Sequence, residues 1–329
     1  MEYRKLGNTN LQLSTIAYGA FAIGGNMWGG NEKKDSIAAV HAALDHGMTT
    51  LDTAPFYGFG LSEEMIGEAI NGRDRTAIQL LTKFGLVWDG SNQGKGEFFF
   101  DAEHNGKPLS VYKYATKANI IKEVEESLTR LGTDYIDLLQ LHWPDNTTRI
   151  SETMEALELL IQQGKIKAAG VSNYSVAQLR EAEATLKLAS NQVSYSMLNR
   201  SIERDLVPHA LENQIGIIAY SPMERGLLTG KYFNDGKLKA DDHRHGYFGQ
   251  FDLDRVQQFL ERISPVAESK SATLSQLVLR WTTLQPGITV VLAGARNAEQ
   301  AIANADALRL DLSAEELNLI NVELSKLNR

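Results

Sequence analysis

Short runs of apolar and β-branched residues alternate along the chain with longer segments in which apolar residues recur at helical spacing. The short runs predict β-strands and the longer segments predict amphipathic helices, since apolar positions repeat every second residue on a half-buried strand and every third or fourth residue on a helix. The predicted strands are Thr15–Tyr18, Thr49–Asp52, Ile78–Thr82, Ile136–Leu141, Ala168–Val171, Gln192–Tyr195, Ile217–Tyr220 and Thr289–Leu292. The predicted helices are Lys34–His46, Glu63–Ile70, Ile120–Leu131, Ile150–Gln163, Val176–Leu188, Glu203–Asn213, Leu274–Leu284 and Ala298–Ala305.

This alternation of strands and helices indicates parallel strands joined by right-handed crossovers. Eight such units favour an α/β fold of the (β/α)8 TIM-barrel type, although an open doubly wound sheet has the same rhythm. Before the first strand, Tyr3–Leu6 and Leu11–Leu13 flank a Gly-Asn-Thr-Asn turn and predict an N-terminal β-hairpin. Near the other end, Ser313 and Glu316 have the spacing of a capping box and predict an extra C-terminal helix.

Two polar stretches interrupt the rhythm. Trp88–Lys117 follows the third strand and Arg225–Phe251 follows the seventh, on the side where barrel enzymes build their sites. We predict that both are loops, acting as functional lids or mobile segments. The first contains Gly-Glu-Phe-Phe-Phe-Asp, which indicates a hydrophobic flap or an interface patch. Because no Pro/Ser-rich linker divides the chain, we predict a single domain over residues 1–329.

The composition restricts the classes of function. The net charge of −8 argues against nucleic-acid binding and against docking on anionic membranes, which both favour basic surfaces. The absence of cysteine excludes thiol catalysis, disulfides and cysteine-ligated zinc. Neither a secretory signal nor a run of about eighteen apolar residues is present, so we expect a cytoplasmic protein. No pattern in the sequence indicates an oligomeric state.

Charged or polar residues end three successive predicted strands. Asp52 ends the second strand, Lys83 the third and His142 the fourth, and Tyr57 follows Asp52 by five residues. In a barrel these strand ends converge on one face. Taken singly, Asp52 is also explained as a turn cap, Tyr57 as a wall aromatic, Lys83 as a snorkelling surface lysine and His142 as a core histidine. Together they predict a catalytic site.

These four residue types suit the reduction of a carbonyl, which needs an acid to protonate the developing alkoxide. A tyrosine has a pKa of about 10 and is a weak acid near neutrality, but a neighbouring cation lowers its pKa. Lys83 would supply that charge, and Asp52 would keep Lys83 charged in a partly dry site. His142 would then hydrogen-bond the carbonyl oxygen and orient it.

Several segments resemble the aldo-keto reductase family: DTAPFYG, the Thr-Lys pair at the third strand, LHWPD, GVSNYS and YSPMERGLLTGKY. The resemblance covers nearly the whole chain. It implies a barrel, a nicotinamide cofactor that is usually NADPH, and a tetrad of Asp52, Tyr57, Lys83 and His142 with Tyr57 as general acid. The implied activity is the reduction of aldehydes, ketones or open-chain sugars to alcohols.

Two other functions remain open from the sequence. One is a nicotinamide-binding regulatory or accessory subunit on the same fold. The other is a metal-dependent barrel isomerase, which lacks support because the chain has no convergent cluster of acidic residues and imidazoles. The His243-Arg244-His245 stretch lies in a polar loop without further ligands, so we predict no metal site.

The dinucleotide site would not be a Rossmann domain, because no predicted strand is followed by GxGxxG. Gly226–Lys231 is also one residue too short for a Walker A loop. The resemblance instead implies two groups of residues, one that contacts the nicotinamide carboxamide and one that lines the pyrophosphate. It also implies that Tyr220 stacks on the nicotinamide ring. A turn and helix cap is the alternative explanation of Gly-Val-Ser-Asn. The implied carboxamide residues are Ser172, Asn173 and Gln192, and the implied pyrophosphate residues are Ser221, Met223, Gly226, Leu228 and Lys231.

The last predicted strand leads to a candidate phosphate site. Gly294 opens a turn, Asn297 is suited to cap the following helix, and Arg296 lies at the N-terminus of that helix. Backbone donors at a helix N-terminus favour phosphate, and a guanidinium group suits a 2′-phosphate. The resemblance places Arg296, Gln300 and Asn304 around the adenosine end. We therefore predict NADP as cofactor, with NADPH preferred over NADH.

Aromatic residues follow the first four strands and would line an apolar pocket for a small-molecule carbonyl substrate. They are Trp28, Phe56, Trp88 and Trp143. Trp28 and Trp143 resemble pocket positions of the family, whereas ordinary packing is an equal alternative for Trp88 and Trp143. The stretch Trp88–Lys117 would form much of the remaining wall.

Overall fold

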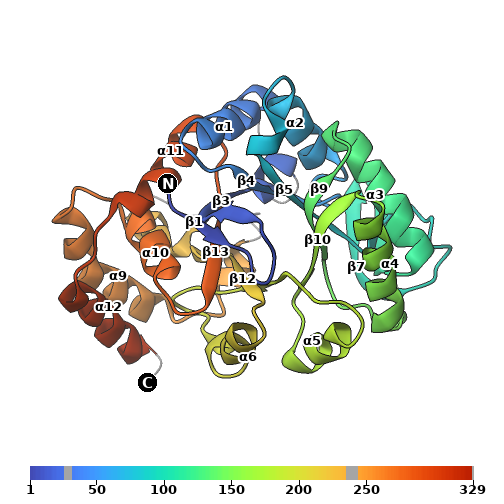
Figure 1. The fold of residues 1–329 in the computed structure, drawn as a ribbon. Coiled ribbons are helices and arrows are strands. Elements are labelled where there is room, and N and C mark those ends of the chain that lie inside the picture. Colours follow the sequence, from blue (N-terminus) through green and yellow to red (C-terminus); the bar gives the residue numbers. More distant parts are fainter. Residues whose placement is uncertain (26–31, 235–243, 328–329) are drawn as a thin grey trace.

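Eight parallel strands close into a barrel in the computed structural model, which describes residues 1–25, 32–234 and 244–327 (Figure 1). Strands adjacent in the barrel follow one another along the chain, apart from an antiparallel sheet inserted after β5. The predicted barrel is confirmed, and the open sheet is excluded. The strands are β3 (Ile16–Gly19), β4 (Thr50–Asp52), β5 (Gln79–Phe84), β9 (Ile136–Leu141), β10 (Ile166–Ser172), β11 (Ser190–Ser194), β12 (Gly216–Tyr220) and β13 (Ile288–Gly294).

Helices cover the outside of the barrel. The predicted helices are all present, with ends that differ by a few residues; the fifth, predicted to reach Leu188, ends at Glu183. Apolar residues fill the space between these helices and the strands. The helices are α1 (Lys33–Asp45), α2 (Leu61–Ile70), α3 (Lys117–Leu131), α4 (Ile150–Gln162), α5 (Val176–Glu183), α6 (Leu206–Glu212), α10 (Leu274–Thr283) and α11 (Ala298–Asp306).

The predicted N-terminal hairpin closes one end of the barrel. Strands β1 (Tyr3–Lys5) and β2 (Gln12–Ser14) pair antiparallel, and Leu6 and Leu13 are fully buried among the inward-facing side chains of the barrel strands. The turn passes close under the barrel: a β-carbon on Gly7, whose φ is +48°, would lie 2.5 Å from a backbone oxygen of Ala189. Only glycine fits this approach.

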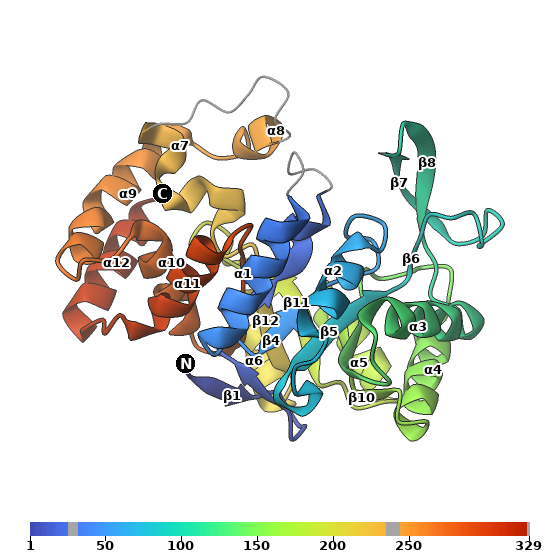
Figure 2. The same cartoon turned by 90° about the horizontal axis from the view of Figure 1, so that it is seen from above.

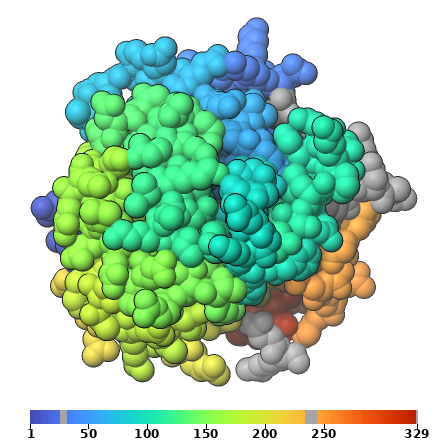
Figure 3. Space-filling model, turned by 90° about the vertical axis from the view of Figure 1, so that its right-hand side faces the viewer, coloured from blue at the N-terminus to red at the C-terminus, as the bar shows by residue number. Residues whose placement is uncertain are grey.

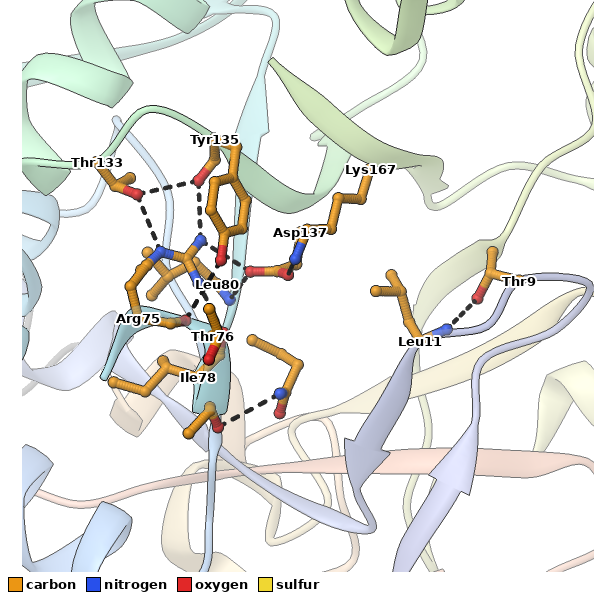
Figure 4. A network of polar contacts seen from close by, with 12 residues as sticks. Thr9, Leu11, Arg75, Thr76, Ile78, Leu80, Thr133, Tyr135, Asp137 and Lys167 are labelled. Atoms are coloured by element: carbon orange, nitrogen blue, oxygen red, sulfur yellow. Dashed lines mark hydrogen bonds and ion pairs between the residues drawn. The ribbon is translucent and has the colours of Figure 1, made fainter. Parts of the chain in front are cut away.

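An ionic cluster centred on the buried Asp137 lies near the same end of the barrel (Figure 4). Asp137 of β9 accepts hydrogen bonds from Arg75 at 2.8 Å, from Lys167 at 2.9 Å and from the Leu80 backbone at 2.9 Å. The Tyr135 ring lies 4.1 Å from the Arg75 guanidinium carbon and 4.0 Å from the Lys167 ammonium. The cluster joins β5, β9 and β10 at the starts of these strands, where barrels place residues for stability rather than catalysis.

The two polar stretches contain regular structure, so the prediction that they are loops is wrong. Trp88–Lys117 contains most of an antiparallel sheet made of β6 (Leu86–Val87), β7 (Glu97–His104) and β8 (Lys107–Lys113). The described part of Arg225–Phe251 contains most of a 3₁₀ segment, η4 (Glu224–Thr229), and α7 (Lys231–Asn234) and α8 (Arg244–Phe248). Figure 2 shows β7, β8, α7 and α8 at the end of the barrel opposite β1.

Two further helices pack together beside α10. One, α9 (Leu253–Glu268), is not among the helices predicted from the sequence. Its apolar residues lie on one face, and the Asp252 side chain caps its N-terminus. The other is the predicted C-terminal helix, α12 (Ala314–Leu327), and its capping box is present: the Ser313 N–H donates to Glu316 at 2.8 Å, and the Glu316 N–H donates to Ser313 Oγ at 3.2 Å. No helix within the described residues combines the length and apolarity needed to span a membrane.

Candidate active site

The ends of β4, β5 and β9 bring three of the predicted residues together. Asp52 is the last residue of β4, Lys83 lies one residue before the end of β5, and His142 directly follows β9. The parallel register pairs Lys83 with Gln140, and the His142 N–H donates to the Phe84 carbonyl at 2.9 Å. The three side chains therefore come from adjacent strands at the same end of the barrel.

Asp52 and Lys83 form a buried ion pair. The Lys83 ammonium donates to Asp52 Oδ1 at 2.7 Å and to the Thr53 carbonyl at 2.8 Å, and both charged residues are only 1% exposed. Burial acts to lower the pKa of Lys83, but the charges of Asp52 and Tyr57 and their hydrogen bonds outweigh it, so this pKa is raised. Lys83 therefore carries its positive charge at neutral pH.

The second oxygen of Asp52 is held by two amides. Gln192 donates to Asp52 Oδ2 at 2.8 Å, and Gln140 lies at 3.4 Å from the same atom. The Gln192 amide also lies 3.3 Å from Gln140 Oε1. The sequence interpretation did not include Gln140, although a single glutamine in the otherwise apolar end of β9 is a readable signal. The Gln192 side chain therefore helps to hold Asp52 of the ion pair. This contact is additional to the cofactor contact that the resemblance implies for Gln192.

Tyr57 lies against Lys83. The ammonium is 4.8 Å from the centre of the phenol ring, and the ring packs edge-on to Phe21 at 4.8 Å and to His142 at 5.7 Å. Burial raises the pKa of Tyr57, the charge and hydrogen bond of Lys83 oppose the rise, and the charge of Asp52 adds to it. The net direction is upward, so the sequence-based expectation of a lowered pKa is wrong: the cost of burying a phenolate exceeds the stabilisation by Lys83.

His142 is neutral at physiological pH. Burial and the nearby charge of Lys83 hold the pKa of His142 well below its usual range. A neutral imidazole has one nitrogen that donates and one that accepts a hydrogen bond. Tyr57 and His142 thus place a phenolic O–H and a neutral imidazole beside the fixed positive charge of Lys83. This arrangement suits a substrate oxygen that becomes negative during the reaction.

Ser172, Asn173 and Tyr220 form a polar network next to His142. Tyr220 donates to Asn173 Oδ1 at 2.9 Å, and the Asn173 amide donates to the His142 carbonyl at 3.2 Å and to Ser172 Oγ at 3.0 Å. Helix α5 is capped by Ser175, so neither Ser172 nor Asn173 is its cap. Asn173 has a left-handed backbone with φ of +63°, a strained conformation of the kind that gathers at functional sites.

A left-handed turn follows β12. The φ angle is −100° at Met223 and then positive at Glu224 (+46°), Arg225 (+52°) and Gly226 (+97°), and Ser221 also lies at +56°. The turn is closed by its own backbone: the N–H groups of Gly226 and Leu228 donate to the Met223 carbonyl at 2.9 and 3.2 Å, and the Glu224 N–H donates to the Ser221 carbonyl at 3.0 Å. Of the other two residues implied for the pyrophosphate, Leu228 is buried and Lys231 is exposed. Neither Glu224 nor Arg225 was among the predicted site residues.

The turn after β13 has the predicted arrangement. Asn297 caps α11 by accepting from the Gln300 N–H at 3.0 Å. Gln300 in turn accepts from the Arg296 N–H at 2.9 Å, and Asn304 donates to the Gly294 carbonyl at 3.0 Å. Arg296 is exposed at the N-terminus of α11. Gln300 and Asn304 therefore fix the turn that carries Arg296.

Aromatic side chains form a continuous cluster around Phe56, the residue before Tyr57. The Phe56 ring lies 5.7 Å from Trp88 and 5.6 Å from Phe100 of β7, and Phe99 lies 4.8 Å from Phe100 and 5.4 Å from Trp143. The Phe-Phe-Phe run is thus split: Phe99 and Phe100 join the cluster, whereas Phe98 is 52% exposed beside Tyr112. Trp28, the fourth predicted pocket residue, lies outside the described residues.

Hydrogen bonds connect the antiparallel sheet of β6, β7 and β8 to the segment that follows His142. Glu97 of β7 accepts from the Asn146 side chain at 2.8 Å, and Asp145 accepts from the Ala115 N–H at 2.9 Å, just after β8. Figure 3 shows the face of the molecule where this sheet (teal) stands beside α3 and α4 (green). The phenylalanines of β7 are therefore held in place relative to His142 and Trp143.

Metal ligands do not gather within the described ranges: no group of three or more His, Asp or Glu side chains there could hold an ion. His243 lies outside the described residues, while Arg244 and His245 begin α8.

Comparison with known proteins gives one consistent result. The family model for the Aldo/keto reductase family matches residues 15–322. The chain is 38% identical to Aldo-keto reductase YhdN of Bacillus subtilis (98% of this chain, 94% of the relative) and 33% identical to the NADH-specific methylglyoxal reductase of Escherichia coli (98% of each).

Solved structures give the same result. A glycerol dehydrogenase from Gluconobacter oxydans superposes with a TM-score of 0.86 at 34% identity, covering 99% of this chain and 95% of that one. An aldo/keto reductase from Klebsiella pneumoniae, solved with NADP and acetate, superposes with a TM-score of 0.72 at 28% identity, covering 98% of this chain and 95% of that one.

Proposed function

This chain belongs to the aldo/keto reductase family of NAD(P)H-dependent oxidoreductases acting on carbonyl compounds, and we propose that it reduces small aldehydes and ketones to alcohols with NADPH as the preferred donor. We further propose that Tyr57 is the general acid. The observation that carries this proposal is the convergence of the Asp52–Lys83 ion pair, Tyr57 and His142 at the same end of the barrel.

Each member of the tetrad has a distinct task. Tyr57, whose raised pKa keeps it protonated, donates its proton to the carbonyl oxygen as that oxygen becomes an alkoxide. Lys83 stabilises the phenolate that this transfer leaves, and Asp52 holds Lys83 in place and charged. The neutral His142 orients the carbonyl oxygen beside Tyr57. The nicotinamide, when bound, supplies the hydride.

Two groups of residues suit the nicotinamide and pyrophosphate parts of a dinucleotide. The Ser172–Asn173–Tyr220 network lies beside His142 and suits the nicotinamide end, with Gln192 adjoining it. The left-handed turn with Ser221, Met223 and Gly226 suits the pyrophosphate, because it directly follows Tyr220 and so continues from the nicotinamide end. Leu228 and Lys231 extend that turn.

NADPH preference rests on Arg296. Its guanidinium is exposed at the N-terminus of α11, on a turn fixed by Gln300 and Asn304, which suits the 2′-phosphate that distinguishes NADPH from NADH. The Escherichia coli relative is named as NADH-specific, so this preference has to be measured for the present chain. Arg296→Ala should weaken NADPH binding selectively, and an equal loss of NADH affinity would refute the assignment.

The substrate wall would be mainly aromatic. Phe56, Trp88 and Trp143 form one aromatic cluster with Phe99 and Phe100 that begins next to Tyr57 in the chain, and such surfaces favour the apolar part of a carbonyl compound. The Escherichia coli relative is named for methylglyoxal and the Gluconobacter structure for glycerol, so a panel should span small and bulky carbonyls.

The proposal is tested by following the loss of reduced-nicotinamide absorbance with NADPH and that panel. Turnover that is lost in Tyr57→Phe is the expected result. Tight cofactor binding without turnover on any carbonyl would instead indicate a nicotinamide-binding regulatory subunit. Activity that EDTA abolishes would indicate metal-dependent chemistry.

A further inference from the structure

Glu123 is a buried carboxyl group that the proposed chemistry does not use. It lies on α3 and is 7% exposed. Its Oε2 accepts a hydrogen bond from the Gly85 N–H at 2.9 Å, and its Oε1 accepts one from the Asn119 amide. The same amide donates to the Tyr114 carbonyl at 2.9 Å. Glu123 therefore joins, directly and through Asn119, two segments that are distant in the sequence.

These two segments are the points where the antiparallel sheet leaves and rejoins the rest of the chain. Gly85 connects β5 to β6, Tyr114 directly follows β8, and the Tyr114 N–H donates to the Gly85 carbonyl at 3.1 Å. We call Gly85 and Tyr114 the neck of the sheet. At Gly85 φ is +90°, and a β-carbon there would lie 2.7 Å from Leu141 Cδ1, so this position has only backbone groups by which it can be held.

The neck lies between the catalytic strand ends and the aromatic cluster. On the barrel side, Gly85 follows Phe84, whose carbonyl accepts the His142 N–H at 2.9 Å. On the other side, β8 pairs with β7 and places Val111 opposite Phe100 of the aromatic cluster. A shift at the neck would therefore move the aromatic side chains of β7, while the barrel strands would still hold the tetrad together.

Glu123 has no counter-charge within the part of the chain that the structure describes. Of the nearby cations on α3, Arg130 is held by Glu63 of α2 at 2.7 Å, and Lys122 is held by Asp89 at 3.0 Å. The hydrogen bonds to Glu123 come from uncharged amides. A buried carboxylate in such surroundings is costly, so the neutral form is favoured.

The protonation of Glu123 changes at mildly alkaline pH. Burial raises the pKa of Glu123 to about 8, the charges of Glu126 and Glu63 add to the rise, and the hydrogen bonds from Gly85 and Asn119 oppose it. Glu123 is therefore neutral at pH 7. Above pH 8 a charge forms in this buried place and favours states in which the carboxylate reaches water.

We propose that Glu123 and Asn119 are positioning residues for the carbonyl substrate, which hold the neck and thereby fix the aromatic wall that the substrate contacts. The neutral form of Glu123 holds the neck, and its ionised form loosens it. This inference rests on the proposed function, because it takes Phe99 and Phe100 as part of the substrate wall. It assigns the position of that wall to side chains on α3, outside the barrel.

The first test measures steady-state kinetics of Glu123→Leu with NADPH and benzaldehyde at pH 7. We expect KM for benzaldehyde to rise roughly 3- to 10-fold, as for loss of one buried hydrogen bond, with kcat and the NADPH dissociation constant within about two-fold of the wild type. Asn119→Ala should show the same split and serves if Glu123→Leu does not fold. Glu125→Gln, exposed on the same helix beside Lys165, is the control and should leave KM unchanged.

The outcomes separate this inference from the proposed function. Folded Glu123→Leu and Asn119→Ala variants with a wild-type KM, even if less stable in urea, would show that both residues are structural only and would overturn the inference. A loss of kcat with KM unchanged would also overturn it. A wild-type chain that reduces no carbonyl would instead refute the proposed function.

The second test uses pH and the conservative variant Glu123→Gln, which keeps an acceptor for the Gly85 N–H but cannot ionise. In the wild type, KM for benzaldehyde should rise by up to about 10-fold between pH 7 and pH 9, one unit above the pKa of about 8. In Glu123→Gln this rise should be absent, although every other titrating group of the site is shared. An equal rise in both proteins would contradict control of the wall by the charge of Glu123.

Discussion

Replacing Asp52 by asparagine tests the buried ion pair at the centre of the site. Asp52 and Lys83 lie 2.7 Å apart and are 1% exposed, so removing the negative charge leaves a buried ammonium without its counter-charge. Breaking one side of a buried pair costs about 3–5 kcal/mol. Because asparagine still offers an oxygen to Lys83, we expect Asp52→Asn to lower the free energy of unfolding by about 3 kcal/mol at pH 7.

The loss should depend on pH in a defined direction. In the wild type the pKa of Lys83 is raised, whereas without the charge of Asp52 burial dominates and lowers it below its unfolded value. The unfolded variant then binds a proton that the folded variant does not, so its stability increases as pH rises toward about 10, the ordinary lysine pKa. The stability gap to the wild type should therefore be larger at pH 7 than at alkaline pH.

Urea unfolding of the wild type, Asp52→Asn and the double variant Asp52→Asn/Lys83→Met measures both effects. The double variant removes both charges and should recover most of the lost stability, because a neutral buried pair needs no counter-charge. A loss below about 1 kcal/mol at pH 7, or a double variant as unstable as the single one, would refute the reasoning.

Three further predictions concern other parts of the molecule. Burial raises the pKa of Glu123 to about 8, so the folded state retains a proton that the unfolded state loses above about pH 4.5. The free energy of unfolding should therefore fall with rising pH, by up to about 1.4 kcal/mol per pH unit, until about pH 8. Urea unfolding of Glu123→Gln at several pH values should lack this contribution. Phe100→Ala should change the ratio of kcat/KM for benzaldehyde and methylglyoxal, whereas Phe98→Ala, exposed on the same strand, should not; equal effects would contradict a wall formed by Phe100. Asp137→Asn should cost about 1–3 kcal/mol in unfolding experiments, because the partly buried Arg75 and the exposed Lys167 lose their shared buried carboxylate, yet kcat should be unchanged.

The barrel and the convergence of the tetrad could be predicted because both follow from local pattern. The mainly apolar strand Ile136–Leu141 is followed directly by His142, and the parallel topology fixes which strand ends meet. The capping box of Ser313 and Glu316 is equally local. That residues 1–329 form one domain stays a prediction.

Other features depend on contacts between distant residues and were missed. The polar composition of Trp88–Lys117 gives no sign of β7 and β8. These strands are stabilised by the packing of Phe100 on Phe56 and of Phe99 on Trp143, which are distant in the sequence. Helix α9 was missed although its apolar residues have helical spacing, because it lies outside the strand–helix repeat. The direction in which the pKa of Tyr57 shifts depends mainly on burial. The degree of burial cannot be predicted from the charged residues near Tyr57 in the sequence.

The contacts of Glu224 also become visible only in the folded chain. In sequence Glu224 is one acidic residue in a polar turn, but its left-handed backbone and its two hydroxyl partners bring together Ser196 and Tyr247, which are 51 residues apart in the sequence. Such a buried carboxylate is recognisable only once its partners are placed.

The most direct test of the account is the turnover of Tyr57→Phe at saturating NADPH and carbonyl substrate, with cofactor affinity measured alongside. We predict that kcat falls by roughly 10²- to 10⁴-fold, the usual contribution of a positioned acid, while the cofactor dissociation constant stays within about two-fold of the wild type. A phenylalanine variant that turns over within a few-fold of the wild type would contradict proton donation by Tyr57.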